Sequence, residues 1–219
     1  MSNVLRIAPA PLAQTARRRL LHVGCGYPSA HRLHATFKSD SGWQEIRLDI
    51  DEKVKPDIVC SAANMSASVS SGSVDAVWSS HTIEHLYDHE VIEAFAEFLR
   101  VLGPGGFLLL RCPDLAAAAE CLLQNGIEHV AYESPAGPIT PLDMLFGYRP
   151  SVAVGNLFMA HRTGFTDERI SRMLLEAGFT EVRTKRDGAF DLWAIAFTAR
   201  SDIPSCLEQL ARNGVDFES

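Results

Sequence analysis

The chain has 219 residues, which is enough for one domain of ordinary size with a substantial hydrophobic core. Its 47% of hydrophobic and 21% of charged residues are typical of a globular protein and exclude a disordered one. The apolar runs fall short of the roughly 18 residues that span a bilayer, so no membrane partner is expected. The net charge of −7 disfavours nucleic acid as a partner.

The N-terminus and the cysteines predict where the protein resides. Neither an apolar h-region nor a small-residue cleavage site precedes the basic residues 17–19, so no signal peptide is predicted. The five cysteines are scattered along the chain and none has CxxC spacing. This usage predicts a reduced, cytoplasmic protein and disfavours a thiolate zinc site.

Strand and helix patterns alternate along the chain. Strands are expected over residues 19–23, 44–49, 57–60, 76–79, 106–111, 181–186 and 192–199. Helices are expected over residues 89–101, 114–123, 167–177 and 206–212. This order predicts an α/β fold for residues 1–219: a single doubly wound domain with a seven-stranded, mostly parallel sheet and helices on both faces.

The helix over residues 89–101 is the best marked, because apolar residues recur at helical spacing on one face. They are Val91, Ile92, Phe95, Phe98 and Leu99. Gly103 and Pro104 are expected to end this helix, since neither residue type continues one readily.

Residues 126–164, after the fifth strand, do not fit a minimal sheet. A structureless segment of this length is unusual inside a compact domain. Its content of Leu, Phe, Met and Tyr disfavours disorder. We therefore expect an ordered cap over the ligand end of the sheet. A homodimer contact and a loop packed on itself are alternatives that the sequence leaves open.

Two neighbouring strand ends carry residues suited to a nucleotide-like ligand. The first strand ends on Gly24 and Gly26, and Asp49 ends the second strand 23 residues after Gly26. Glycine lets the backbone approach a ligand closely, and an acidic residue at the next strand end can accept hydrogen bonds from ribose hydroxyls. The pair predicts an adenosine-type cofactor. Asp51 is expected to cap the turn that follows.

The order of the motifs resembles class I S-adenosylmethionine-dependent methyltransferases, and is closest to the type 11-like predicted methyltransferases. The matching pieces are LHVGCG at 21–26, LDID at 48–51, GSVDAV at 72–77, SHTIEHL at 80–86, LRVLGPGG at 99–106 and CPD at 112–114. The resemblance covers roughly residues 18–115 and extends weakly to the last two strands. It implies a Rossmann-like fold, an enzyme, and S-adenosyl-L-methionine as the cofactor.

The resemblance also implies which residues hold the cofactor. Gly24, Cys25 and Gly26 would line its methionine part, and Asp49 would bind the ribose. Ile50 and Met65 would cover the two faces of the adenine, with Ser61 and Ala62 at its edge, and Ser80 and His81 would border the donor methyl. Three departures from the family pattern weaken the expected contacts: His22 and Ser61 replace acidic residues, and Pro28 replaces a third glycine.

The other candidate catalytic and binding residues are histidines and one arginine. His81 is the best-placed general base, because an unperturbed imidazole accepts a proton at neutral pH, although it could equally form only the pocket wall. His81 and His85 are four residues apart, but no third ligand lies at a recognisable spacing, so no metal site is predicted.

In the cap, His161 and Arg162 are candidate substrate-binding residues or part of a solvated turn. Asp75 and Arg100 are expected to be structural.

The predicted function is methyl transfer to a small-molecule or glycan-type acceptor through an oxygen or nitrogen nucleophile. One alternative is a methyltransferase-like subunit that binds a partner without catalysis. A second alternative is an NAD-dependent oxidoreductase, which the missing third glycine disfavours because a pyrophosphate needs a free helix N-terminus.

Overall fold

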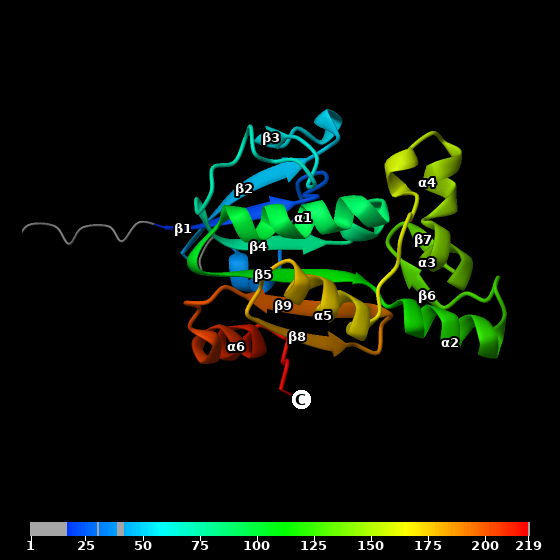
Figure 1. Ribbon diagram of the computed structural model, residues 1–219. Coiled ribbons are helices and arrows are strands. Elements are labelled where there is room, and N and C mark those ends of the chain that lie inside the picture. The colour runs from blue at the N-terminus through cyan, green and yellow to red at the C-terminus, as the bar shows by residue number, and fades with distance from the viewer. Residues whose placement is uncertain (1–16, 30, 39–41, 219) are drawn as a thin grey trace, which may run out of the picture.

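The computed structural model describes residues 17–29, 31–38 and 42–218. Seven strands form one sheet in the order β3-β2-β1-β4-β5-β9-β8 (Figure 1). Their bounds are β1 Arg18–Val23, β2 Trp43–Asp49, β3 Ile58–Val59, β4 Val74–Ser80, β5 Leu102–Pro113, β8 Glu181–Arg186 and β9 Asp191–Phe197. β1 to β5 run parallel, whereas β9 is antiparallel to both β5 and β8. The predicted α/β fold is confirmed.

Side chains that alternate along the central strands build a separate core on each face of the sheet. Leu21 of β1 packs in the core beneath α1 (Asp88–Val101) and α5 (Asp167–Glu176). Leu20, one residue earlier, points to the opposite core, which η1 (Ala35–Phe37) and α6 (Ile203–Arg212) cover. This alternation is the period of two that a buried parallel strand imposes.

Helix α1 confirms the expected helix with one correction. The buried residues on its inner face are Val91, Ala94, Phe95, Phe98 and Val101. Ile92 was expected on this face but is 60% exposed, because it follows Val91 by one residue and is therefore turned about 100° away around the helix. The helix ends at Val101, as expected, but β5 begins at once with Leu102 rather than at Gly106.

Asp75 and Arg100 have the structural roles that were expected of them. Asp75 Oδ2 accepts the backbone N–H of Arg19 at 2.7 Å, across β4 and β1. Arg100 donates to the carboxylate of Glu97 and to the backbone carbonyl of Val69, so it holds the loop before β4 against α1.

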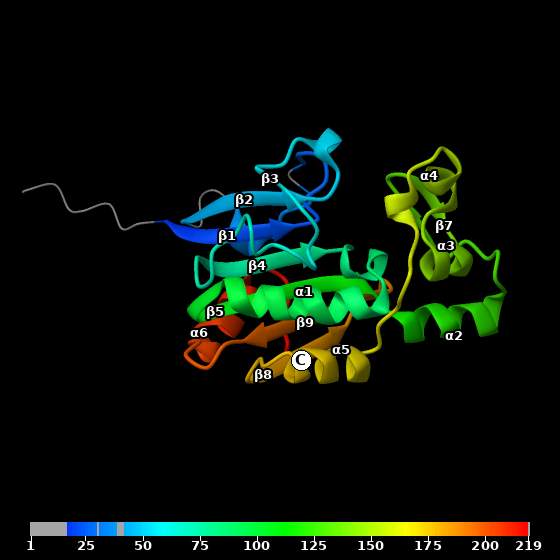
Figure 2. The ribbon, with the colours of Figure 1, turned by 45° about the horizontal axis from the view of Figure 1, so that its top comes forward.

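The cap is ordered and lies beyond the carboxyl ends of the parallel strands (Figures 1 and 2). Its elements are α2 Leu115–Asn125, β6 Tyr132–Ser134, β7 Gly137–Ile139, α3 Pro141–Phe146, α4 Arg149–Ala153 and η5 Leu157–Met159. α2 packs against α3 rather than covering the sheet, so the cap begins before residue 126. None of the helices in the described part of the chain is long and apolar enough to cross a bilayer.

A buried carboxylate organises the centre of the cap. Thr140 and Asp143 form a capping box at the start of α3, and Arg149 Nε donates to Asp143 Oδ1 at 2.9 Å. Burial opposes the charge of Asp143, but the hydrogen bonds from Arg149 and Thr140 outweigh it and lower the pKa of Asp143 to about 2. These bonds stabilise the start of α3 within a segment rich in proline and glycine.

His34 makes the stability of the fold depend on pH. Its ring lies among Phe37, Trp78 and Trp193, and its Nδ1 accepts the backbone N–H of Thr36. Burial, followed by the charges of Arg111 and Lys38, lowers the pKa of His34 to about 4 from an ordinary value of 6.5.

The unfolded chain therefore takes up a proton on His34 below pH 6.5, whereas the folded chain does so only near pH 4. The free energy of unfolding therefore falls as the pH drops from 6.5 towards 4. At pH 5 the titration of His34 alone lowers it by roughly 2 kcal/mol relative to neutral pH. Urea unfolding of wild type and His34→Phe at pH 7.5 and pH 5 measures this loss. Equal pH dependence in the two proteins would contradict it.

Candidate active site

A cavity of about 250 Å³ lies between the carboxyl ends of the strands and the cap. Of the residues that the sequence predicted for the cofactor, seven line this cavity: Gly24, Gly26, Asp49, Ile50, Ser61, Ala62 and His81. The cap closes the other side with Asn156, Phe158, Met159 and Arg162. The fold thus gathers residues from the ends of β1, β2 and β4 around one space, at the edge where open α/β sheets bind ligands.

The turn after β1 requires glycine. Gly24 has φ +68° and Gly26 has φ +57°, and the backbone N–H of Gly24 donates to the carbonyl of Leu48 at 2.9 Å. A Cβ on Gly24 would lie 2.0 Å from Thr82 Oγ1. The missing side chain therefore lets the loop after β4 pack directly against the turn after β1. Sequence reasoning did not single out Thr82, because its importance depends on this packing.

Asp49 is held in place by two backbone groups. Its Oδ2 accepts the N–H of Gly26 at 2.8 Å, and its Oδ1 accepts the N–H of Asp51 at 3.0 Å. A carboxylate oxygen can accept more than one hydrogen bond, so both oxygens retain acceptor capacity towards ribose hydroxyls. Asp51 instead caps η3 (Glu52–Val54) by accepting the N–H of Lys53, which confirms its expected role.

Three predicted cofactor residues do not reach this cavity. Met65 is fully buried in the core, because its N–H donates to Glu97 of α1 and ties its turn to that helix. Cys25 is buried and lines a different cavity. Ser80 Oγ accepts from Arg111 Nε at 3.1 Å. The predicted adenine contact of Met65 and methyl contact of Ser80 therefore do not match the positions of these side chains.

His81 is not arranged as a free general base. The residue has φ +50°, and its ring lies between two carboxylates, with Nε2 3.2 Å from Asp191 and Nδ1 3.5 Å from Glu84. Burial opposes protonation, but the contacts with Asp191 and Glu84 outweigh it and raise the pKa of His81 to about 9. The ring is protonated at neutral pH, and this arrangement favours a role in the pocket wall.

Of the two candidate substrate residues of the cap, Arg162 lines both the main cavity and the smaller cavity beside it, whereas His161 lines only the smaller one. Arg162 lines the main cavity, with its guanidinium 4.4 Å from the ring centre of Tyr87. His161 lines a neighbouring cavity of about 190 Å³ together with Glu84, and its Nδ1 donates to the carbonyl of Met144 at 2.8 Å. Burial lowers the pKa of His161.

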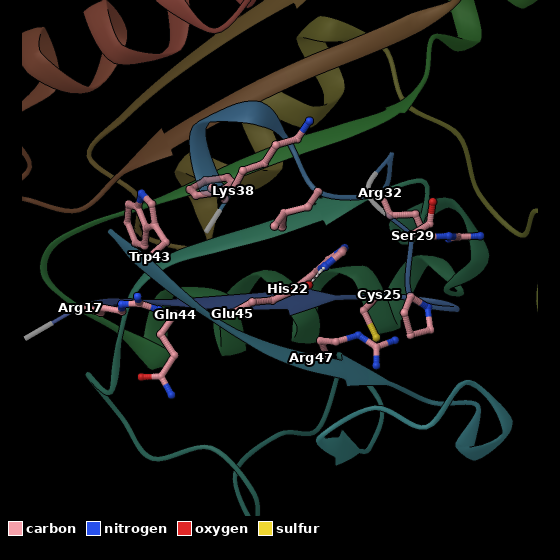
Figure 3. Close-up of a pocket in the computed structure, with 13 residues that line it drawn as sticks. Arg17, His22, Cys25, Ser29, Arg32, Lys38, Trp43, Gln44, Glu45 and Arg47 are labelled. Atoms are coloured by element: carbon pink, nitrogen blue, oxygen red, sulfur yellow. Dashed lines mark hydrogen bonds and ion pairs between the residues drawn. The ribbon is translucent and has the colours of Figure 1, made fainter. Parts of the chain in front are cut away.

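A larger cavity of about 570 Å³ lies on the η1 side of β1 and β2 (Figure 3). His22 and Glu45 face one another there, with Nδ1 2.6 Å from Oε1. Asp49 is not among its lining residues, so this cavity lacks the ribose-binding feature. His22 therefore does not occupy the cofactor cavity in place of the acidic residue found in the resembling family.

The fold and the site together define a class of protein. A parallel sheet completed by an antiparallel β9 between β5 and β8, with a glycine turn after β1 and an acid at the end of β2, is the arrangement expected of a class I methyltransferase. Residues 21–110 match the family described as a methyltransferase domain. This match supports a class I S-adenosylmethionine-dependent methyltransferase with S-adenosyl-L-methionine as its cofactor.

Solved structures share the fold. A SAM-dependent methyltransferase from Archaeoglobus fulgidus superposes with a TM-score of 0.54 at 16% identity, over 83% of this chain and 86% of that one. The Burkholderia thailandensis 1,6-didemethyltoxoflavin-N1-methyltransferase, with 1,6-didemethyltoxoflavin and S-adenosylhomocysteine bound, gives 0.50 at 14% identity over 85% and 72%. A putative methyltransferase of Haloferax volcanii, in complex with the activator Trm112, gives 0.54 at 13% identity over 85% of each chain. No protein of curated function is significantly similar in sequence.

Proposed function

We propose that this protein transfers a methyl group from S-adenosylmethionine to a small-molecule or glycan-type acceptor bound beneath the cap. The observation that supports this proposal is the lining of the cavity. Asp49 and Ile50 line one side of it, and Phe158, Met159 and Arg162 of the cap line the other. A ligand that reaches from the glycine turn towards the cap would be enclosed by both parts of the molecule.

The residues fit the cofactor as follows. Gly24 and Gly26 offer backbone groups without a Cβ to the methionine part, Asp49 offers its carboxylate to the ribose, and Ile50 offers an exposed apolar surface to the adenine. Ser61 Oγ already accepts the N–H of Ala63, so the adenine edge contact is weaker than one from an acidic residue.

The bound cofactor supplies an activated methyl group on a sulfonium. The protein then has to align the acceptor and exclude water, and the cap residues are placed for that task. Arg162 is the candidate for an acidic group of the acceptor, and the Burkholderia neighbour, which holds 1,6-didemethyltoxoflavin, favours an acceptor of small size. We also infer a cytoplasmic location, which the five free cysteines support.

The first test is isothermal titration of the full chain with S-adenosylhomocysteine, followed by NAD. Micromolar binding of S-adenosylhomocysteine without NAD binding is expected. NAD binding alone would favour the oxidoreductase. The residues described after β1 form a loop and the short η1 rather than a long helix that could hold a pyrophosphate.

The second candidate function is a non-catalytic binding subunit, and the cap surface is the observation that favours it. Val154 is 83% exposed, and Phe146 and Leu157 are also largely exposed. Exposed apolar groups of this kind are typical of a contact with another protein or with a second copy. Cofactor binding without turnover, together with a stable heteromeric complex, would support this function, and a dimer mass by light scattering would support the homodimer.

A further inference from the structure

Three potential metal ligands meet where the cap joins the sheet. Glu84 and His85 belong to η4 (Ile83–His85), directly after β4, and His161 follows η5 in the cap. One ligand atom from each of the three residues lies within 4.8 Å of the others. The rings of His85 and His161 have their centres 5.0 Å apart and are tilted by 58° relative to one another. The sequence did not predict a metal site because His161 lies 76 residues beyond His85.

Both imidazoles are held in the form that binds metals. His85 Nδ1 donates to the carbonyl of Ala160 at 3.2 Å, and His161 Nδ1 donates to the carbonyl of Met144 at 2.8 Å. A hydrogen on Nδ1 leaves the lone pair of Nε2 free. A backbone carbonyl behind the ring is the usual partner that fixes the orientation of a metal-ligating histidine.

Glu84 supplies an independent observation that points to a cation. Its side chain is only 2% exposed, and neither carboxylate oxygen has a hydrogen-bond partner in the described part of the chain. The nearest imidazole nitrogens to Oε1 are His81 Nδ1 at 3.5 Å and His85 Nε2 at 4.0 Å. A buried carboxylate without donors is strongly unfavourable. His81 Nε2 also contacts Asp191, which in turn pairs with Arg111. His81 therefore interacts with two carboxylates at once.

We propose that Glu84, His85 and His161 bind a divalent first-row transition-metal ion between the two cavities under the cap. Two imidazoles and a carboxylate form a ligand set that suits Zn²⁺, Mn²⁺ or Fe²⁺ better than Mg²⁺ or Ca²⁺. Zn²⁺ bonds of about 2.0–2.2 Å bring ligand atoms to roughly 3.4 Å apart. The three ligand atoms lie within 4.8 Å of one another, so metal binding requires them to approach by up to about 1.4 Å.

Three protein ligands leave at least one position open on the metal, as in catalytic rather than structural sites. His85 lines the cofactor cavity, whereas Glu84 and His161 line the neighbouring one. The ion would therefore lie between the cofactor cavity and the neighbouring one. This part of the inference rests on the proposed function: the acceptor presents an oxygen ligand, such as a hydroxyl or carboxylate, to the open position.

The test is titration of the metal-free full chain with Zn²⁺ in the absence of cofactor. A single micromolar or tighter site is expected in the wild type. His161→Ala and Glu84→Gln are expected to weaken it at least about tenfold. His129→Ala is the matched control, because His129 is an exposed histidine of the same cap, and it should leave Zn²⁺ affinity unchanged.

Two further measurements distinguish loss of the metal site from a general loss of folding or of cofactor binding. Zn²⁺ should raise the Tm of the wild type and of His129→Ala but not that of His161→Ala, and S-adenosylhomocysteine affinity of His161→Ala without metal should equal that of the wild type. Wild-type Zn²⁺ affinity in both His161→Ala and Glu84→Gln, or no saturable site in the wild type, would overturn the metal site. Zn²⁺ binding without S-adenosylhomocysteine binding would overturn the proposed function instead.

Discussion

Replacing Asp49 by alanine is expected to weaken S-adenosylhomocysteine binding at least tenfold, or about 1.4 kcal/mol. The N–H groups of Gly26 and Asp51 hold the carboxylate oxygens in place, and each oxygen retains capacity to accept a hydrogen bond from a ribose hydroxyl. Alanine removes both acceptors at once. Isothermal titration of the purified variant gives the affinity directly.

Two controls separate a lost ligand contact from a disturbed turn. Asp49→Asn retains one acceptor oxygen and the shape of the side chain, so an intermediate loss is expected. Glu52→Ala removes a carboxylate from an exposed site in the adjacent η3 that does not line the cavity, and it should bind as the wild type does. An affinity of Asp49→Ala equal to that of Glu52→Ala would remove the ribose assignment.

Gly24→Ala is expected to abolish detectable cofactor binding and to lower the unfolding free energy by more than the backbone strain alone. An L-residue in the left-handed region costs about 1–2 kcal/mol. At Gly24 the new Cβ would also lie 2.0 Å from Thr82 Oγ1. The turn after β1 and the loop after β4 must then move apart, which opens the cofactor cavity between them. Urea unfolding and the S-adenosylhomocysteine titration together measure both effects.

Gly72→Ala is the matched control for strain. Gly72 has φ +62°, close to the +68° of Gly24, but the nearest atom to an added Cβ is 4.0 Å away. Gly72→Ala should lower the unfolding free energy by the backbone strain alone, because it creates no clash. It should leave the affinity for S-adenosylhomocysteine unchanged. The double variant Gly24→Ala with Thr82→Gly removes the clashing side chain and should restore part of the binding. Equal behaviour of Gly24→Ala and Gly72→Ala would show that the packing of Thr82 is unimportant.

The sequence by itself determined the elements of the sheet and the first half of the site. The predicted strands and helices match the observed ones to within a few residues in most cases, because alternation, helical spacing and capping residues act locally. Gly24, Gly26 and Asp49 were predictable for a similar reason. They end consecutive strands of one βαβ-like unit, and parallel strands bring their carboxyl ends to the same edge.

Only the tertiary structure decided which side chains meet at long range. Met65 turns into the core because its turn is bonded to α1, and α2 belongs to the cap because it packs on α3. His161 lies beside Glu84 because the chain returns from the cap to the end of β4, where the N–H of Arg162 donates to the carbonyl of Glu84. Such contacts depend on the path of the chain through space, and neither periodicity nor motif spacing records that path.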